Sequence, residues 1–195
     1  MTALDLSFAM SAKDVDQLPA SNAEVAVAGR SNVGKSSLLN ALAGRRQLAH
    51  TSSTPGRTKL LNCFTAPNGS TLVDLPGYGY AKVSKQERAA WERRMKRYLV
   101  TREPLVMTLL LIDGAVGPTG LDRELLRWLR ERQVATTIVA TKHDKVSPSR
   151  RARRKRELAQ GCEVAEDAVV WVSVRQNTQI DRLRALVAGW LDLAN

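Results

Sequence analysis

The segment that most restricts the fold is the octapeptide GRSNVGKS, residues 29–36, which fits G-x-x-x-x-G-K-[ST] at every fixed position. An apolar run typical of a buried strand, EVAVAG, comes directly before it, and residues 35–43 read as a helix. Glycines let consecutive backbone N–H groups turn toward one phosphate, and the helix N-terminus adds its positive end. The segment therefore predicts a phosphate-binding loop, with Lys35 placed to reach the β and γ phosphates and the Ser36 hydroxyl to bind Mg²⁺.

Apolar strand-sized runs alternate with amphipathic helices along the chain, which is typical of a mostly parallel α/β sheet with helices on both faces. We expect six strands, at residues 24–29, 59–66, 70–75, 105–113, 134–141 and 169–173. Asn68-Gly69 is a strong hairpin signal between the second and third strands, and it makes one strand antiparallel to the rest. Residues 1–22 are expected to form an N-terminal extension, and residues 23–195 a single domain.

The remaining helices are expected at residues 86–100, at 120–132, from Ser147-Pro148 onward, and near 180–190. In the second of these, the apolar face is expected to consist of Leu121, Leu125, Trp128 and Leu129.

The sequence DLPG, residues 74–77, ends a predicted strand, where ligands bind in open α/β sheets. Because it follows a phosphate loop, we expect Asp74 to hold Mg²⁺ through water and the Gly77 N–H to reach the γ-phosphate. Tyr78 then stands where Ras-type switches place a glutamine that orients the attacking water. Tyrosine cannot orient water in the same way. Two uses for Tyr78 and Tyr80 stay open, which are contact with a partner and packing under a loop.

The sequence TKHD, residues 141–144, follows another predicted strand and points to guanine. An ionised Asp144 accepts hydrogen bonds only, and guanine offers two adjacent donors where adenine offers none. The stem of Lys142 is expected to cover the base. After the last strand, the backbone N–H groups of Ser173 and Val174 are expected to reach guanine O6.

The polar segment 45–58 reads as a loop before the second strand. Thr58 in this loop is the candidate that closes on Mg²⁺ when the γ-phosphate is present. The neighbouring hydroxyls leave this assignment open on chemistry alone, and they belong to Thr51, Ser52, Ser53 and Thr54.

Taken together, GRSNVGKSSLLNAL, PGRTKLLN, VDLPGYGYAKV and TKHDK resemble the EngB (YihA/YsxC) family of bacterial ribosome-biogenesis GTPases, in the TrmE-Era-EngA-EngB-Septin-like class. The resemblance runs from about residue 24 to the final helix. It implies a Ras-like P-loop GTPase domain that binds GTP and GDP with Mg²⁺. It also implies a role late in assembly of the large ribosomal subunit, and a need for the protein in normal division septum formation. Two positions depart from the family, which commonly has serine at Val174 and glycine at Gln179.

The resemblance also implies a set of residues that line the nucleotide, with Ser36 and Thr58 as magnesium ligands. The lining residues are Gly29, Arg30, Ser31, Asn32, Val33, Gly34, Lys35, Ser36, Gly56, Arg57, Thr58, Lys59, Leu60, Asp74, Leu75, Pro76, Gly77, Thr141, Lys142, His143, Asp144, Val172, Ser173 and Val174.

Hydrolysis is expected to depend on Lys35, Asn32 and Thr58, and to be slow because Tyr78 replaces the glutamine. Asn32 resembles the P-loop asparagine that helps to bind K⁺ in related GTPases, where the ion occupies the position of an arginine finger. The alternative is that Asn32 only braces the loop. Arg57 is a second candidate for the arginine-finger role, supplied from within the same chain.

The chain carries 30 Lys and Arg against 19 Asp and Glu, a net charge of +11, which favours a polyanionic partner. Six of the seven residues 150–156 are basic, and a second basic set follows the switch segment: Arg88, Arg93, Arg94, Lys96 and Arg97. We expect contact with the RNA of the large ribosomal subunit or its precursor, and the alternative is a solvated helix face.

The targeting and cysteine patterns favour a cytoplasmic protein. No signal peptide or bilayer-length apolar run is found, so membrane insertion is not expected. Cys63 and Cys162 read as ordinary thiols, and a monomer is the default. The favoured function is a GTP-hydrolysing switch on a large-subunit precursor. The alternatives are a nucleotide-gated RNA-binding module with incidental hydrolysis and a septum-associated signalling GTPase.

Overall fold

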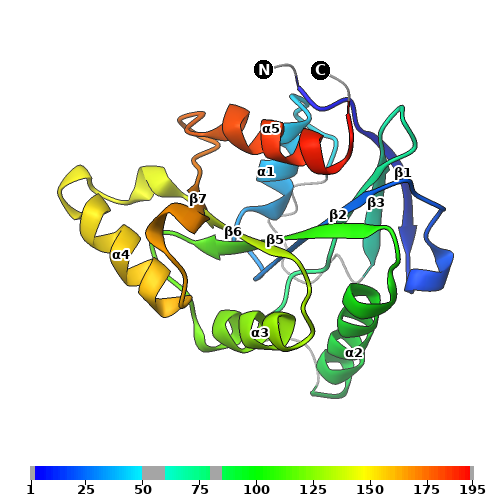
Figure 1. Cartoon of the computed structure of the whole chain (residues 1–195), viewed down its shortest axis with the longest axis horizontal. Coiled ribbons are helices and arrows are strands. Elements are labelled where there is room, and N and C mark those ends of the chain that lie inside the picture. The colour runs from blue at the N-terminus through cyan, green and yellow to red at the C-terminus, as the bar shows by residue number, and fades with distance from the viewer. Residues whose placement is uncertain (1–2, 50–59, 80–84, 194–195) are drawn as a thin grey trace.

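The structure, a computed structural model, describes residues 3–49, 60–79 and 85–193. Within these residues, seven strands form one sheet in the order β1-β3-β4-β2-β5-β6-β7, with helices on both faces (Figure 1). The α/β class and the mostly parallel sheet are confirmed. The hairpin at Asn68-Gly69 is also confirmed, since β3 pairs antiparallel with β4 and Gly69 has a φ of 81°.

The main elements occur in the predicted order, and their bounds lie close to the predicted ones. The strands are β1 (Ser7–Ala12), β2 (Glu24–Gly29), β3 (Leu61–Thr65), β4 (Thr71–Asp74), β5 (Leu105–Asp113), β6 (Thr136–Thr141) and β7 (Val169–Trp171). The α-helices are α1 (Lys35–Leu42), α2 (Lys85–Thr101), α3 (Gly120–Glu131), α4 (Arg151–Gly161) and α5 (Ile180–Trp190). No helix among the described residues has both the length and the apolar character that a membrane crossing requires.

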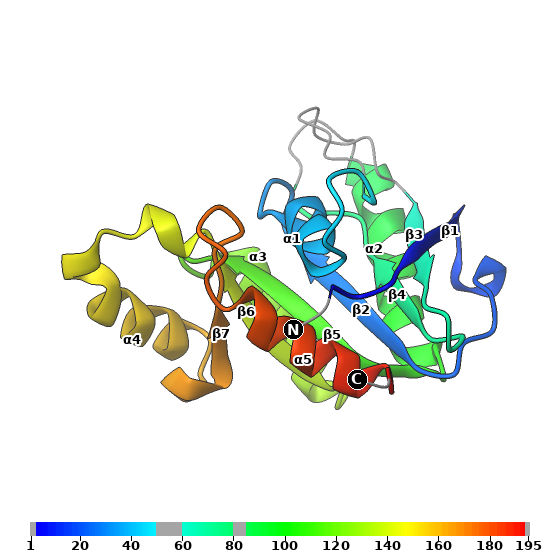
Figure 2. The same cartoon turned by 90° about the horizontal axis from the view of Figure 1, so that it is seen from above.

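The expectation of six strands is wrong, because the N-terminal extension contributes a seventh. Strand β1 lies at the sheet edge and pairs antiparallel with β3, so that β3 alone opposes the direction of the other strands (Figure 2). The strand has a mostly exposed pattern with Ala12 buried, and Phe8 packs edge-on against Phe64. Such a short, half-polar edge strand leaves little apolar signal in the sequence.

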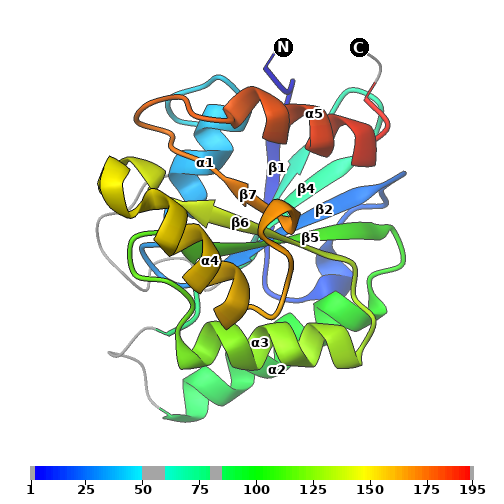
Figure 3. The same ribbon diagram turned by 60° about the vertical axis from the view of Figure 1, so that its left-hand side comes forward.

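The strands divide the core into two layers, one on each face of the sheet. Along β2, Val25 and Val27 face the layer covered by α1 and α5, whereas Ala26 and Ala28 face the layer of α2, α3 and α4 (Figure 3). This alternation follows from the two-residue period of a strand. Both faces of β2 are fully buried, as the continuous apolar run predicted.

The parallel strands place their carboxyl ends along one edge. Strand β2 pairs in parallel with both β4 and β5, and β5 pairs in parallel with β6. Gly29 is aligned with Leu111, and Asp113 with Thr141. Four polar segments that are distant in sequence therefore meet at this edge, where open α/β sheets bind ligands.

The opposite end of the sheet is closed by a buried charge network around Glu24. This fully buried carboxylate accepts hydrogen bonds from the hydroxyl groups of Tyr98 and Thr71, both at 2.6 Å. The Arg102 guanidinium donates two more, at 3.0 and 2.9 Å. The network fixes the end of α2 to the start of β2, because a buried carboxylate is tolerated only when it is fully bonded.

The predicted apolar face of α3 is partly wrong. Leu125 and Leu129 are buried as expected, but Leu121 is 47% exposed and Asp122 is buried in its place. Asp122 accepts hydrogen bonds from the backbone N–H and the hydroxyl of Thr119, both at 2.7 Å, which caps the helix. The spacing of apolar residues cannot predict which residue is buried when a helix cap decides it.

Candidate functional site

The phosphate loop runs from the end of β2 into α1 as the octapeptide predicted. Asn32 and Gly34 have φ values of 63° and 108°, and α1 begins at Lys35. The two left-handed residues reverse the chain so that consecutive N–H groups face one side, which forms an anion-binding concavity. Glycine carries the more extreme of the two conformations, in which a side chain would be strained.

Lys35 and Asp74 place two opposite charges in the floor of this loop. Burial lowers the pKa of Lys35, and the nearby Asp74 carboxylate works against that effect. Burial raises the pKa of Asp74 to about 6, while Lys35 and a hydrogen bond with Asn62 oppose the rise. The two charges partly compensate for each other, yet neither recovers its full loss of hydration.

One oxygen of the Asp74 carboxylate suits a cation. Its Oδ1 is buried and makes no hydrogen bond within the described residues. A buried carboxylate oxygen without a donor fits the hard oxygen-ligated ion Mg²⁺, for which the Ser36 hydroxyl at the start of α1 is the other expected ligand in the described residues. Such an ion would neutralise charge between the β and γ phosphates. The third expected contributor, Thr58, lies outside the described residues.

The segment after Asp74 packs directly on the phosphate loop. The Ser31 N–H donates to the Tyr78 carbonyl at 2.9 Å, and the Ser31 hydroxyl donates to the Gly77 carbonyl at 3.2 Å. A Cβ atom on Gly77 would come within 3.0 Å of Lys35 Nζ and 2.9 Å of the Ser31 nitrogen. Residue 77 must therefore be glycine for this close approach.

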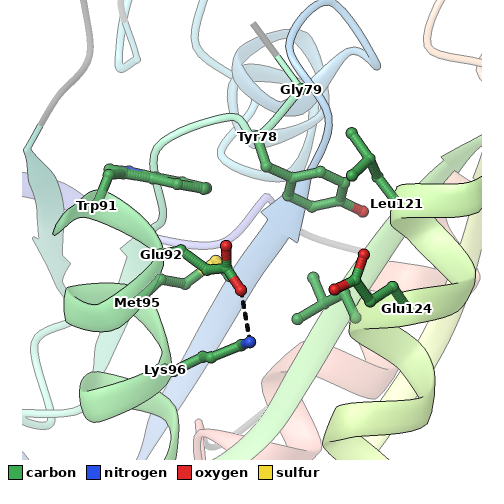
Figure 4. Close-up of a pocket in the computed structure, with 9 residues that line it drawn as sticks. Tyr78, Gly79, Trp91, Glu92, Met95, Lys96, Leu121 and Glu124 are labelled. Carbon is green, nitrogen blue, oxygen red and sulfur yellow. Dashed lines mark hydrogen bonds and ion pairs between the residues drawn. The ribbon is translucent and has the colours of Figure 1, made fainter. Parts of the chain in front are cut away.

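The side chain of Tyr78 turns away from the phosphate loop and packs toward α3. It is 8% exposed, and its hydroxyl donates to Asp122 Oδ1 at 2.7 Å. Burial, together with the charge of Asp122, raises the pKa of Tyr78 far above its usual range. The ring lines a pocket with Trp91 and Met95 of α2 (Figure 4). Of the two uses left open for Tyr78, this structure shows packing, whereas Tyr80 lies outside the described residues.

The base-recognition turn is tied to the phosphate loop by two side chains. The Thr141 hydroxyl donates to the Val33 carbonyl at 2.7 Å. Lys142 Nζ donates to the Asn32 carbonyl at 2.8 Å and pairs with Asp113 Oδ2 at 2.7 Å. The side chain of Lys142 is thereby held between the phosphate loop and the end of β5, and its role in covering a base stays a prediction.

Asp144 is held by the segment after β7. The Ser173 hydroxyl donates to Asp144 Oδ1 at 2.6 Å, and this bond lowers the pKa of Asp144. Asp144 therefore stays ionised and acceptor-only, which suits the two donors of guanine. The Ser173 N–H donates to the Thr178 carbonyl at 3.2 Å, so a contact with guanine O6 would require an exchange of that bond. Val174, the other expected O6 contact, is 40% exposed.

His143 lies between the two recognition residues but faces the interior. Its ring packs edge-on against Trp171, and its backbone N–H donates to the Val172 carbonyl at 3.1 Å. Burial, with Arg151 and Lys155 nearby, lowers the pKa of His143, which keeps the ring neutral. His143 therefore contributes to the site by holding the conformation of the base-recognition turn.

The other expected lining residues fall into two groups. Gly29, Leu75, Pro76 and Val172 are buried, Arg30 is half-buried, and Leu60 is half-buried just before β3. Gly56, Arg57, Thr58 and Lys59 lie outside the described residues.

Sequence reasoning missed three residues that position the site: Asp113, Asn62 and Asp122. Asp113 had a usable signal, because it ends a buried strand at the ligand-binding edge. Asn62 and the bond from Tyr78 to Asp122 had none, since in each case the two residues are distant in sequence.

The phosphate loop, the Asp74 turn and the guanine-type recognition turn, joined on one parallel sheet, define a P-loop GTPase. The protein-family model described as 50S ribosome-binding GTPase matches residues 24–142. Over 96% of both chains, this chain is 43% identical to the probable GTP-binding protein EngB of Pelotomaculum thermopropionicum. The chain belongs to the EngB family of GTP-binding proteins and is a GTPase.

Solved structures agree with this fold. A crystal structure of a probable GTP-binding protein EngB matches with a TM-score of 0.72 and 23% identity, over 88% of this chain and all of that one. Era in complex with MgGDPNP and nucleotides 1506–1542 of 16S ribosomal RNA matches with a TM-score of 0.66 and 25% identity, over 86% of this chain and 56% of that chain.

We predict that Ser173→Ala weakens binding of GDP by about tenfold, since it removes a hydrogen bond to the charged group that reads guanine. The measurement is a titration with a fluorescent GDP derivative. Ser149→Ala, at an exposed serine on a nearby turn, is the matched control and should bind as the native protein does. Equal affinities for both variants would show that Asp144 holds its position without Ser173.

The raised pKa of Asp74 predicts a pH-dependent response to magnesium. Because the neutral acid is favoured below pH 6, a proton competes with Mg²⁺ there, and above pH 6 the carboxylate is free to attract it. We expect the gain in GDP affinity on adding Mg²⁺ to fall by about tenfold per pH unit below that point. Titrations with Mg²⁺ or EDTA across this range test it. Asp74→Asn should remove the pH dependence, and a magnesium effect that stays constant through pH 6 would contradict the prediction.

Proposed function

We propose that this protein is a GTP-dependent switch that binds the large ribosomal subunit or its precursor in the GTP form and leaves after slow hydrolysis. In this proposal it acts in the cytoplasm, as a monomer, in assembly of that subunit. The single observation that carries the proposal is the cationic face of α4 beside the base-recognition turn. The requirement for the protein in normal septum formation rests on the family resemblance alone.

The α4 region offers many charges to a polyanion. Arg150, Arg153 and Arg156 are exposed, and the other three basic residues of 150–156 are half-buried. The second basic set offers fewer, because Arg97 pairs with Asp14 and Asp16 and Lys96 pairs with Glu92. The α4 region is therefore the better candidate for contacts with RNA phosphates.

The comparisons support a ribosomal partner. The family model carries the description of a 50S ribosome-binding GTPase, and the related Era structure was solved with a segment of ribosomal RNA. Both are statements about relatives, and for this chain they make RNA the first polyanion to test.

Slow hydrolysis follows from the way the site is built. Lys35 and the amides of the phosphate loop would neutralise the phosphates, but Tyr78 is committed to Asp122 and cannot orient a water. We propose that Asn32, exposed on the loop, helps to bind K⁺ next to the phosphates. The burial of Tyr78 also favours a second candidate function, a nucleotide-gated RNA-binding module whose hydrolysis is incidental.

The proposal predicts nucleotide-dependent binding to ribosomes. We expect the protein to co-sediment with purified large subunits at fixed salt when loaded with a non-hydrolysable GTP analogue, and to bind less when loaded with GDP. Arg153→Glu with Arg156→Glu should weaken binding in both states, whereas Arg127→Glu on α3 should not. Equal binding in both nucleotide states would favour the RNA-binding module, and no binding in either would refute a ribosomal partner.

The role of Asn32 predicts a difference between two salts. Turnover of GTP by the native protein should be faster in KCl than in NaCl at equal ionic strength. Asn32→Ala should bring turnover in KCl down to its value in NaCl, with little change in NaCl itself. If the variant and the native protein have the same rates in both salts, Asn32 only braces the loop.

A further inference from the structure

A basic hollow lies next to the base-recognition turn, and Lys145 of that turn lines it. It has a volume of about 560 Å³ and lies where α4 meets the loops that follow β5 and β6. Four cationic side chains line it, and one carboxylate, that of Glu157, is shared between two of them. The cations are Lys145, Arg150, Arg153 and Arg154.

The hollow suits phosphate groups better than other anions. Three of its four cations are arginines, whose planar guanidinium groups bind phosphate oxygens in pairs. Arg153 is 79% exposed and Arg150 is exposed, so both can turn toward a ligand. Val116, the residue after the lining residue Ala115, is 62% exposed and offers an apolar side chain to a ribose or a base. Phosphates with sugars and bases beside them are the chemistry of an RNA strand.

One wall of the hollow belongs to the turn that holds the recognition residues, and the other is the loop that follows Asp113. Lys145 lines the hollow and directly follows Asp144 in the short helical turn His143–Lys145. Ala115 lines it from the other loop, and its N–H donates to Asp113 Oδ1 at 3.0 Å. Asp113 in turn pairs with Lys142. One wall is therefore one residue away from Asp144, and the other is two residues away from Asp113, the partner of Lys142.

Arg154 of helix α4 lies beside the loop that forms the second wall. A Cβ atom on Gly117 would lie 3.4 Å from Arg154 Nη1, and the Gly117 N–H donates to the Asp113 carbonyl at 2.7 Å. A ligand held between α4 and the two loops would thus restrain both Asp113 and the turn that carries Asp144. Restraint of groups that a second ligand must also order produces positive coupling between the two sites.

We propose that this hollow binds backbone phosphates of RNA and that its occupancy slows the release of guanine nucleotide. The proposal rests on the proposed function, since it gives the RNA partner a specific site and makes that site part of the switch. In this proposal the slower release raises the equilibrium affinity for nucleotide, and linkage then requires that bound nucleotide raises the affinity for RNA by the same factor as RNA raises the affinity for nucleotide.

The experiment uses the full chain loaded with a fluorescent GDP derivative and a labelled RNA hairpin as the probe. The hollow variant is Lys145→Gln with Arg150→Gln, which keeps long polar side chains and removes two charges. The matched control is Arg127→Gln with Arg182→Gln, two exposed arginines on α3 and α5 that do not line the hollow. RNA affinity is measured by anisotropy across a salt series, and GDP release is measured with and without RNA.

We expect RNA to slow GDP release from the native and control proteins by about fivefold or more. In the hollow variant this slowing should be lost, and the slope of log affinity against log salt should fall by about 2. An unchanged slope in the hollow variant would overturn the site, while nucleotide-dependent binding to large subunits could still hold through the rest of α4. RNA that binds the hollow without slowing release would overturn the coupling.

If the native protein does not bind the hairpin, the same assay with vesicles containing phosphatidylglycerol follows. Binding to vesicles alone would overturn both the RNA site and the proposed function in favour of an acidic membrane surface. Co-sedimentation with large subunits by a native protein that binds no hairpin would overturn the hollow as an RNA site and leave the proposed function standing.

Discussion

The two hydrogen bonds from Thr141 and Lys142 to carbonyl oxygens of the phosphate loop are the interactions on which the site depends. They join the segment that reads the base to the segment that holds the phosphates, although more than 100 residues separate them in sequence. Ser31 makes the equivalent connection to the turn after Asp74. The phosphate loop thus contacts both the base-recognition turn and the turn after Asp74. A structural change in any of these three segments is transmitted to the other two through the phosphate loop.

The opposite charges of Lys35 and Asp74 beside the phosphate loop explain why this site favours a bound ligand. Lys35 and Asp74 lose hydration in the fold, and the two charges only partly compensate for each other. A nucleotide with its cation would supply the missing partners, an anion for the lysine and a metal for the carboxylate. The free energy that the fold gives up in burying them is regained on binding, which makes the folded protein more stable when it is loaded.

Much of this arrangement could be predicted from the sequence, because the phosphate loop and the recognition turn are contiguous segments whose chemistry needs fixed residue types. The buried strands had continuous apolar runs, and the hairpin had Asn68-Gly69. Strand β1 could not be predicted, since β3 is the one strand it pairs with among the described residues and its mostly exposed residues give no periodic signal. The roles of Asp122 and the Ser173 hydroxyl also required the structure, because each acts across a distance in the chain that spacing rules do not cover.

The edge position of β1 bears on how this protein can be handled. The family-model match begins at residue 24, so a protein shortened at its N-terminus to begin there would lack β1. Strand β3 would then become the open edge, with its backbone groups unpaired on one side and with Leu61, Cys63 and Phe64 losing their cover. Open edges of this kind invite pairing between molecules, so the trimmed protein would be prone to aggregate on expression. The N-terminal extension thus covers the edge of the sheet that would otherwise be open to pairing with another molecule.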